Sequence, residues 1–107
     1  MYWLVALLIS SVCVSSLYAL DAPSLEHGEK IFQQCVGCHG SNGKNKAFGR
    51  SGIIAGQAQD ALMQSLKMYH DNDFKDHGTA LVMSKQIRNM SPQDMSDVAF
   101  YISKLPK

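Results

Sequence analysis

The chain has 107 residues, 46% of them hydrophobic, and a formal net charge of +1 at pH 7 with histidine counted as neutral. This length predicts a single domain, and the near balance of charges argues against a nucleic-acid-binding protein, which is normally strongly basic. All ten Lys and Arg and all nine Asp and Glu lie beyond Leu20, so the residues up to that point form a chemically distinct segment.

That segment, MYWLVALLISSVCVSSLYAL, is predicted to contain a secretory signal peptide of residues 1–19. Its apolar run becomes serine-rich and ends near the small residue Ala19, as such leaders do. No Lys or Arg marks its start, and residues 3–20 are about long enough to cross a bilayer, so an uncleaved anchor is the alternative. Cys13 lies inside this segment and is interpreted as part of the leader.

Beyond the leader fewer than ninety residues remain, and the predicted domain covers residues 24–107. A domain of this size buries a small core and often needs a disulfide, a metal or a cofactor for stability. Its first helix is predicted to begin near Ser24, with Glu26 in the first turn, where negative charge suits the helix dipole. Apolar or small residues at i, i+3, i+4 and i+7 form one inward face of this helix, which is expected to run directly into a cysteine pair. That face consists of Gly28, Ile31, Phe32 and Cys35.

The stretch CVGCHG, residues 35–40, contains Cys35 and Cys38, followed at once by His39. A structural zinc site would need a second pair of ligands at a similar spacing, and the candidates His70 and His77 are too far apart in sequence. A redox dithiol normally opens a helix within a strand-and-helix pattern, and no strand is predicted here. The spacing Cys-x-x-Cys-His is that of a c-type haem attachment site.

The chemistry of covalent haem attachment explains this spacing. Two thiols add to the two vinyl groups of the porphyrin and form thioether bonds, and the two intervening residues place the sulfur atoms at the required separation on one curved turn. The adjacent imidazole then faces the iron from the same side of the ring. The predicted cofactor is therefore one covalent haem c, attached at Cys35 and Cys38, with His39 as an axial iron ligand.

Residues 40–56 contain five glycines interspersed with Ser and Asn, and they are predicted to form a loop. Lys44, Lys46 and Arg50 make this loop locally basic. The simpler interpretation is a solvated loop. The alternative is a docking rim beside the haem edge, where positive charge would steer an acidic partner.

Two helical patterns follow the loop. The one at 59–69 places Leu62, Leu66 and Tyr69 on a shared face, with Met63 beside it. The polar stretch HDNDFKDHG interrupts the chain after it, and a weaker helical pattern covers 81–89.

The last helix is the best marked, and it completes an all-α domain. Ser91 is a capping residue, Pro92 fits the first helical position, and Asp94 stands three residues after the cap. Pro106 ends the helix. Its inward stripe consists of Met95, Val98, Ala99, Ile102 and Leu105.

A methionine on the other side of the iron would raise the reduction potential. Four of the six methionines are explained by the leader or by helix packing. These are Met1, Met63, Met68 and Met95. Met83 and Met90 remain, both in the segment before the last helix, and periodicity does not separate them. His70 or His77 as the sixth ligand is an alternative that would give a lower potential.

On these residues the chain resembles the small bacterial class I cytochromes c over nearly all of residues 24–105. It is similar to the single-haem periplasmic carriers and to one half of the two-haem periplasmic cytochromes. Three segments carry the resemblance: GEKIFQQCVGCHG from Gly28, IIAGQ from Ile53 and MSKQIRNMSPQDMSDVAFYISKL from Met83.

The resemblance implies the class I cytochrome c fold, in which the N- and C-terminal helices cross around one covalently bound haem. Gly28 and Phe32 on the first helix match the family positions that cross Val98 and Tyr101 on the last. The absence of a side chain at Gly28 would let the two helices approach closely.

The resemblance also favours one of the two methionines as the axial iron ligand. The family's axial methionine lies eight residues before the serine that caps the last helix, and Met83 has that spacing to Ser91. Met90 stands where the family usually has leucine. The implied axial iron ligands are therefore His39 and Met83.

Two departures from the family pattern stand beside this site. Gly52 replaces a proline whose carbonyl accepts the other ring N–H of the proximal histidine, which leaves that hydrogen bond on a looser backbone. Ala61 replaces a tyrosine on one side of the haem pocket.

The resemblance implies that the protein is an electron carrier rather than an enzyme. It would be exported to the periplasm and would bind its redox donors and acceptors transiently. A monomer that binds no nucleic acid is expected, with membrane attachment only if the leader stays uncleaved. Two alternatives are a haem-based gas sensor or enzyme with a displaceable sixth ligand, and a tethered cytochrome subunit of a larger oxidoreductase complex.

Overall fold

The computed structural model describes residues 20–49, 51–74 and 78–107. Its helices are α1 (Leu25–Phe32), α2 (Val36–His39), α3 (Gln59–Asp71), α4 (Gly78–Ile87) and α5 (Pro92–Lys104), with a short 3-10 helix, η1 (Ala47–Gly49), between α2 and α3. No strand occurs in these ranges, which confirms the all-α prediction. The predicted leader lies outside them, and none of the described helices is long and apolar enough to cross a membrane.

Three predicted helices have different ends in the structure, although α3 extends the pattern predicted at 59–69 only by two residues, to Asp71. The first helix does not run into the cysteine pair as expected, because α1 ends at Phe32 and residues 33–35 form a turn before α2. The backbone N–H groups of this turn bond to carbonyls three residues earlier, which tightens the chain and redirects it. The weak pattern at 81–89 corresponds to α4, which begins earlier, at Gly78, and ends at Ile87.

The predicted helix starts are confirmed by their hydrogen bonds. The Ser24 hydroxyl accepts a hydrogen bond from the His27 backbone N–H at 3.1 Å. At the start of α5 the Ser91 hydroxyl accepts from the Asp94 N–H at 3.0 Å, and the Asp94 carboxylate accepts from the Ser91 N–H at 3.1 Å. Both bonds of a capping box are therefore present, with Pro92 as the first helical residue.

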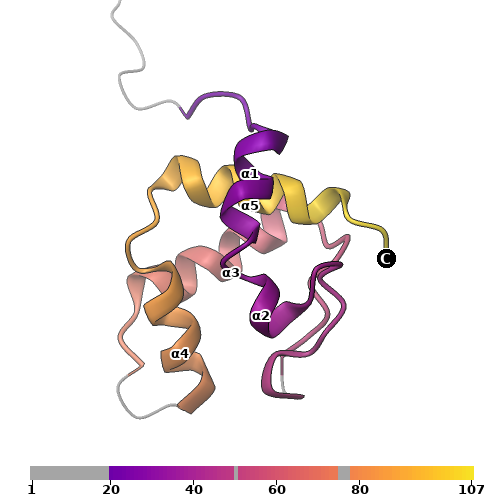
Figure 1. The fold of residues 1–107 in the computed structure, drawn as a ribbon. Coiled ribbons are helices and arrows are strands. Elements are labelled where there is room, and N and C mark those ends of the chain that lie inside the picture. The colour runs from indigo at the N-terminus through magenta and orange to yellow at the C-terminus, as the bar shows by residue number, and fades with distance from the viewer. Residues whose placement is uncertain (1–19, 50, 75–77) are drawn as a thin grey trace, which may run out of the picture.

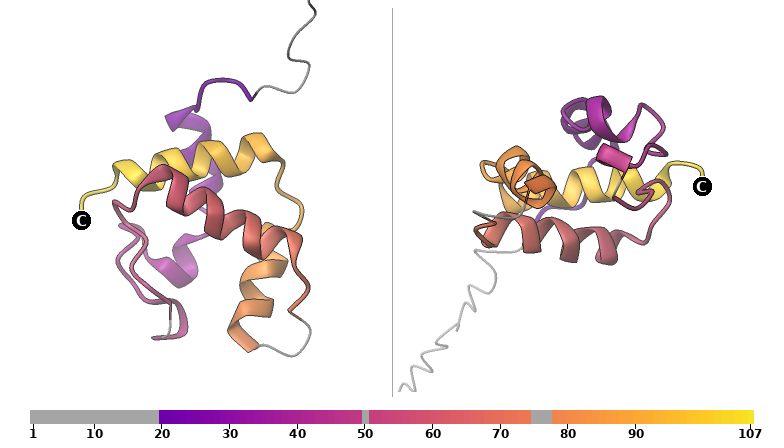
Figure 2. Two further views of the ribbon diagram at one scale, coloured as in Figure 1. Left: turned by 180° about the vertical axis from the view of Figure 1, so that it is seen from behind. Right: turned by 90° about the horizontal axis from the view of Figure 1, so that it is seen from below.

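Helix α1 lies across α5 (Figures 1 and 2). The two helix backbones approach each other closely at Gly28. A Cβ atom at Gly28 would collide with the backbone carbonyl of Asp97 and would lie 2.8 Å from the Cβ of Tyr101. Farther along the crossing, the rings of Phe32 and Tyr101 pack with their centroids 5.3 Å apart at an angle of 48°. The helix crossing implied by the resemblance is present.

The Asp97 carboxylate joins the start of α1 to α5. Its residue is only 2% exposed, and it accepts hydrogen bonds from the Ser24 backbone N–H at 2.9 Å, the His27 Nδ1 at 2.7 Å and the Gln93 amide at 2.9 Å. Burial alone would raise the pKa of Asp97, but the hydrogen bonds from Ser24, His27 and Gln93 and the charge of His27 outweigh it and lower the pKa. The buried charge is therefore fully partnered.

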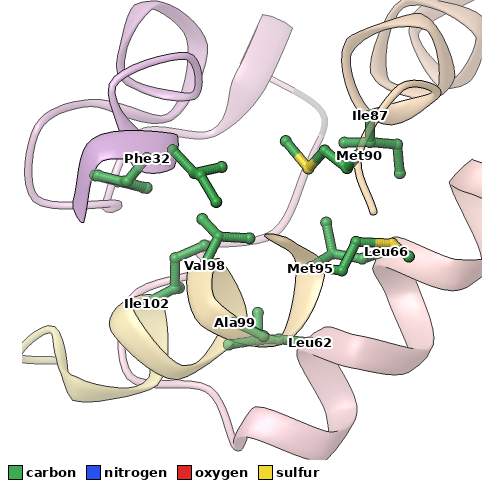
Figure 3. Packing of buried hydrophobic residues seen from close by; sticks show 10 residues of the cluster. Phe32, Leu62, Leu66, Ile87, Met90, Met95, Val98, Ala99 and Ile102 are labelled. Atoms are coloured by element: carbon green, nitrogen blue, oxygen red, sulfur yellow. The ribbon is translucent and has the colours of Figure 1, made fainter. Parts of the chain in front are cut away.

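The hydrophobic core gathers residues from four helices and from the turn after α4 (Figure 3). Helix α5 is central, because α1 and α3 both pack against it, whereas α4 packs mainly against α3. The core consists of Ile31, Phe32, Leu62, Leu66, Ile87, Met90, Met95, Val98, Ala99 and Ile102. Leu105, the last residue of the predicted α5 stripe, is partly buried against it.

We expect Gly28→Ala to lower the free energy of unfolding by about 1–3 kcal/mol, because the new methyl group must push α1 away from the Asp97 backbone. Denaturant unfolding followed by helical circular dichroism would measure this loss. Glu29→Ala is the matched control, since it changes the neighbouring, exposed residue of the same helix. Equal stabilities of the two variants would contradict the close approach at Gly28.

We expect acid to remove the contribution of the Asp97 carboxylate to stability. Because folding lowers its pKa below the ordinary value of 3.8, this contribution is present above that value and is lost as the pH falls through the lower, folded-state pKa. Asp97→Asn should cost about 1.5–3 kcal/mol at neutral pH and should flatten the decline in unfolding free energy in acid. Denaturant unfolding measured across the acidic range, with the exposed Asp60→Asn as control, tests this. An unchanged acid decline in Asp97→Asn would count against it.

Candidate functional site

A cavity of about 500 Å³ opens beside the core, with walls from α2, the segment around η1, α3, α4 and α5. Aliphatic side chains such as Leu62, Leu66 and Ile87 form its floor, and none of its described lining residues is Lys, Arg, Asp or Glu. Helices α2 and α4 lie on either side of the space in front of α3 (Figure 1). The site is therefore an uncharged, largely apolar hollow of a size typical for ligand sites.

Helix α2 places the predicted attachment residues on one wall of this cavity. It is a single turn in which the His39 N–H bonds to the Cys35 carbonyl at 2.9 Å, and Gly40, with φ of +79°, ends it. All three of Cys35, Cys38 and His39 line the cavity. Cys35 is partly buried, Cys38 is exposed and His39 is 7% exposed. The structure thus brings together the three residues that the motif predicted.

The electrostatics of this turn favour uncharged side chains. Burial, with a smaller effect from neighbouring Cys38, raises the pKa of the Cys35 thiol to about 11. Burial also lowers the pKa of His39, which favours the neutral imidazole that binds metals. A zinc site would need thiolates and further ligands. Among the described residues no cluster of three or more His, Cys, Asp or Glu side chains could hold a metal ion, and His77 lies outside them.

One nitrogen of the His39 ring has no hydrogen-bond partner. Its Nδ1 is the one buried side-chain nitrogen or oxygen of the described chain without a hydrogen-bond partner. The resemblance implied a bond to the carbonyl at position 52, but the Gly52 carbonyl accepts instead from the Ser51 hydroxyl at 3.0 Å. A buried polar atom left unpaired is uncommon, and here it shows that the hydrogen bond expected from this nitrogen to position 52 is not formed.

Both candidate methionines line the cavity, Met83 from α4 and Met90 from the segment between α4 and α5. Met90 is 9% exposed and packs in the core with Ile87 and Met95 (Figure 3). Met83 is only partly buried and lies at the margin of the core. The structure excludes neither of them. Met63, Met68 and Met95 do not line the cavity, and neither does His70, whose Nδ1 pairs with Asp71 at 2.7 Å.

Several cavity residues were not singled out from sequence. Phe48 lines the cavity, is 59% exposed and has a positive φ of 54°, which is uncommon for an aromatic residue. Thr79 and Val82 contribute from α4. Tyr69 lines the cavity as well, whereas Ala61, expected to shape the pocket, is exposed and does not. A strained backbone cannot be read from residue type, which is why sequence patterns missed Phe48.

The basic loop is not part of the cavity wall. Lys44 and Lys46 are exposed and do not line it, and Arg50 lies outside the described residues. The docking rim proposed for these three residues therefore stays a prediction.

Comparison with known proteins places this site in a family. The sequence pattern described as cytochrome c matches residues 25–106. This chain belongs to the cytochrome c family.

Two curated relatives support the same assignment. The chain is 32% identical over 99 residues to a protein named cytochrome c-553 from Nitratidesulfovibrio vulgaris, a match that covers 92% of this chain and 96% of the relative. It is 34% identical over 76 residues to cytochrome c-554(548) from Halomonas halodenitrificans, covering 71% of this chain and 89% of that protein. The cytochrome is therefore an electron-transfer haem protein of class I.

The cavity of this cytochrome fits the family's covalently bound haem c. Its walls are apolar, as a porphyrin requires, and its two free thiols stand beside a buried neutral imidazole. When bound, haem c supplies an iron atom that takes up and releases one electron. The chain's own contribution is to place the two thiols at α2, to favour a neutral imidazole, and to keep charged side chains out of the described walls.

Proposed function

We propose that this cytochrome is a single-haem electron carrier in which Cys35 and Cys38 form the thioether bonds, and His39 and Met83 are the axial iron ligands. The observation that carries the proposal is that all four side chains line one uncharged cavity, Cys38 and His39 from α2, Cys35 from its N-cap position and Met83 from α4. A haem iron with a protein ligand on each face cycles between ferrous and ferric states with little rearrangement. This favours electron transfer over substrate chemistry.

Packing supports Met83 over Met90 as the sixth ligand. Met90 is nine-tenths buried among Ile87 and Met95 and is accounted for by the core (Figure 3). Met83 lines the cavity without being enclosed by the core, so its thioether is available for a ligand. The family spacing of eight residues to the capping Ser91 favours the same choice.

The site of action that we propose is the periplasm, reached by export under the direction of residues 1–19. The apolar, uncharged character of this segment supports export, and c-type haem is attached to exported chains. The mature domain would span residues 24–107 as a monomer. Redox partners would dock transiently at the mouth of the cavity, where Phe48 and Val82 expose apolar surface.

Replacing both Cys35 and Cys38 by alanine should abolish covalent haem attachment. Acidified acetone would then extract the pigment, or the chain would be colourless. Wild-type protein from a host able to mature c-type cytochromes should keep its pigment on the polypeptide under the same treatment. Pigment that partitions into acetone from the wild-type chain would overturn the attachment assignment.

Met83→Ala should leave the sixth coordination position of the iron without a protein ligand, because it removes the sulfur atom. We expect the weak far-red sulfur-to-iron band of the ferric protein to disappear, cyanide and carbon monoxide to bind rapidly, and the reduction potential to fall by on the order of 100 mV, since axial ligands set haem potentials over a range of about 0.8 V. Absorption spectra and redox titration measure these changes.

Met90→Ala is the matched control. It should retain the far-red band and the slow ligand binding while lowering stability by about 2–5 kcal/mol, because it leaves a cavity in the core. The reverse pattern would identify Met90 as the ligand. A high-spin wild-type spectrum with rapid cyanide binding would favour a sensor or an enzyme and would refute the carrier.

A further inference from the structure

Ser84 is a fully buried polar residue in the middle of α4 that the proposed function does not use. It is 0% exposed, and it does not line the cavity. Its hydroxyl donates to the backbone carbonyl of Asn72 at 3.2 Å and accepts from the Arg88 guanidinium at 3.1 Å. Both hydrogen-bonding functions of the hydroxyl are therefore satisfied inside the protein.

The acceptor Asn72 lies at the end of a different helix. Asn72 is the C-cap residue of α3, and its side-chain amide donates to the Met68 carbonyl at 2.8 Å, which closes the last turn of α3. A continuous chain of hydrogen bonds thus runs from Arg88 through Ser84 and Asn72 to Met68. It ties the middle of α4 to the end of α3, the helix on which α4 mainly packs.

This tie restrains how α4 can rotate. Successive residues in a helix point about 100° apart, so Ser84 directed at α3 turns the neighbouring Met83 toward the cavity that it lines. Ile87 is buried near Ser84 on α4, but apolar contacts are not directional and tolerate small rotations. A hydrogen bond weakens steeply when its angle changes, and it therefore sets the rotation more narrowly.

We propose that Ser84 is a positioning residue that sets the orientation of α4 and thereby holds the Met83 sulfur in place as the sixth iron ligand. This inference rests on the proposed function, because it takes Met83 to be that ligand. The Ser84 hydroxyl does not touch the haem site. It acts through the helix that carries Met83.

The test compares the holoprotein variants Ser84→Ala, Ser84→Thr and Ser96→Ala. Ser96 is the matched control, since it is 6% exposed in α5 and does not line the cavity. Alanine has a higher helix propensity than serine, so both alanine variants share any helix stability that the substitution adds. Arg88→Met is an additional variant, because it removes one hydrogen bond from Ser84 at an exposed position.

We expect Ser84→Ala to bind cyanide in the ferric state roughly five to ten times faster than wild type, as the loss of the one hydrogen bond that joins α4 to Asn72 implies. Its far-red sulfur-to-iron band should weaken and its reduction potential should fall. Ser84→Thr, which keeps the hydroxyl, should restore the band, and Arg88→Met should change in the same direction as Ser84→Ala but less. Ser96→Ala should match wild type in all three readouts.

The outcomes separate the two proposals. If Met83→Ala retains the far-red band, the ligand assignment fails and the role of Ser84 falls with it. If Met83→Ala loses the band but Ser84→Ala behaves like Ser96→Ala in band intensity, potential and cyanide rate, only the positioning role is overturned. Should Ser84→Ala fail to fold, an unchanged cyanide rate in Ser84→Cys, whose thiol is only a weak donor to the Asn72 carbonyl, would overturn the positioning role.

Discussion

The close approach of α1 to α5 at Gly28 is the constraint on which the rest of the structure depends. A helix backbone that contacts another backbone leaves no room for a Cβ, and only glycine meets this condition. Once α1 is seated, Phe32 packs against Tyr101 and the buried Asp97 receives its hydrogen bonds from the start of α1. The turn at residues 33–35 then directs α2 into the cavity wall. The position of the cysteine pair is therefore a consequence of a helix crossing elsewhere.

The cavity is a second consequence, and it links stability to function. A cavity of about 500 Å³ opens beside the core of this small domain. Leu62, Leu66 and Ile87 belong both to the core and to the cavity wall. In the cytochrome c family, covalently bound haem c occupies such a space. The cofactor of this family thus completes the hydrophobic core as well as carrying the electron.

Three buried polar side chains show how the chain separates structural from functional groups. Asp97 accepts three hydrogen bonds, and the Ser84 hydroxyl both donates and accepts, so each is satisfied within the protein. His39 has a buried Nδ1 with no partner. The first two hold helices together, whereas burial lowers the pKa of His39 and favours its neutral form. Satisfied buried groups rigidify a fold, whereas an unsatisfied one is uncommon and needs an explanation of its own.

The sequence by itself determined the class of the protein, because local signals carry that information. The cysteine and histidine spacing, the capping box at Ser91 and the periodic apolar stripe of α5 each depend on neighbours within a few residues. Only the tertiary structure decided that α1 stops at Phe32 and that Phe48, rather than Ala61, lines the cavity. The same holds for the Gly52 carbonyl, which serves Ser51 instead of His39, and for the bond from Ser84 to Asn72. Such features depend on contacts between separate segments of the chain, or on a backbone angle that is unusual for the residue type, as at Phe48. Local sequence patterns do not contain this information.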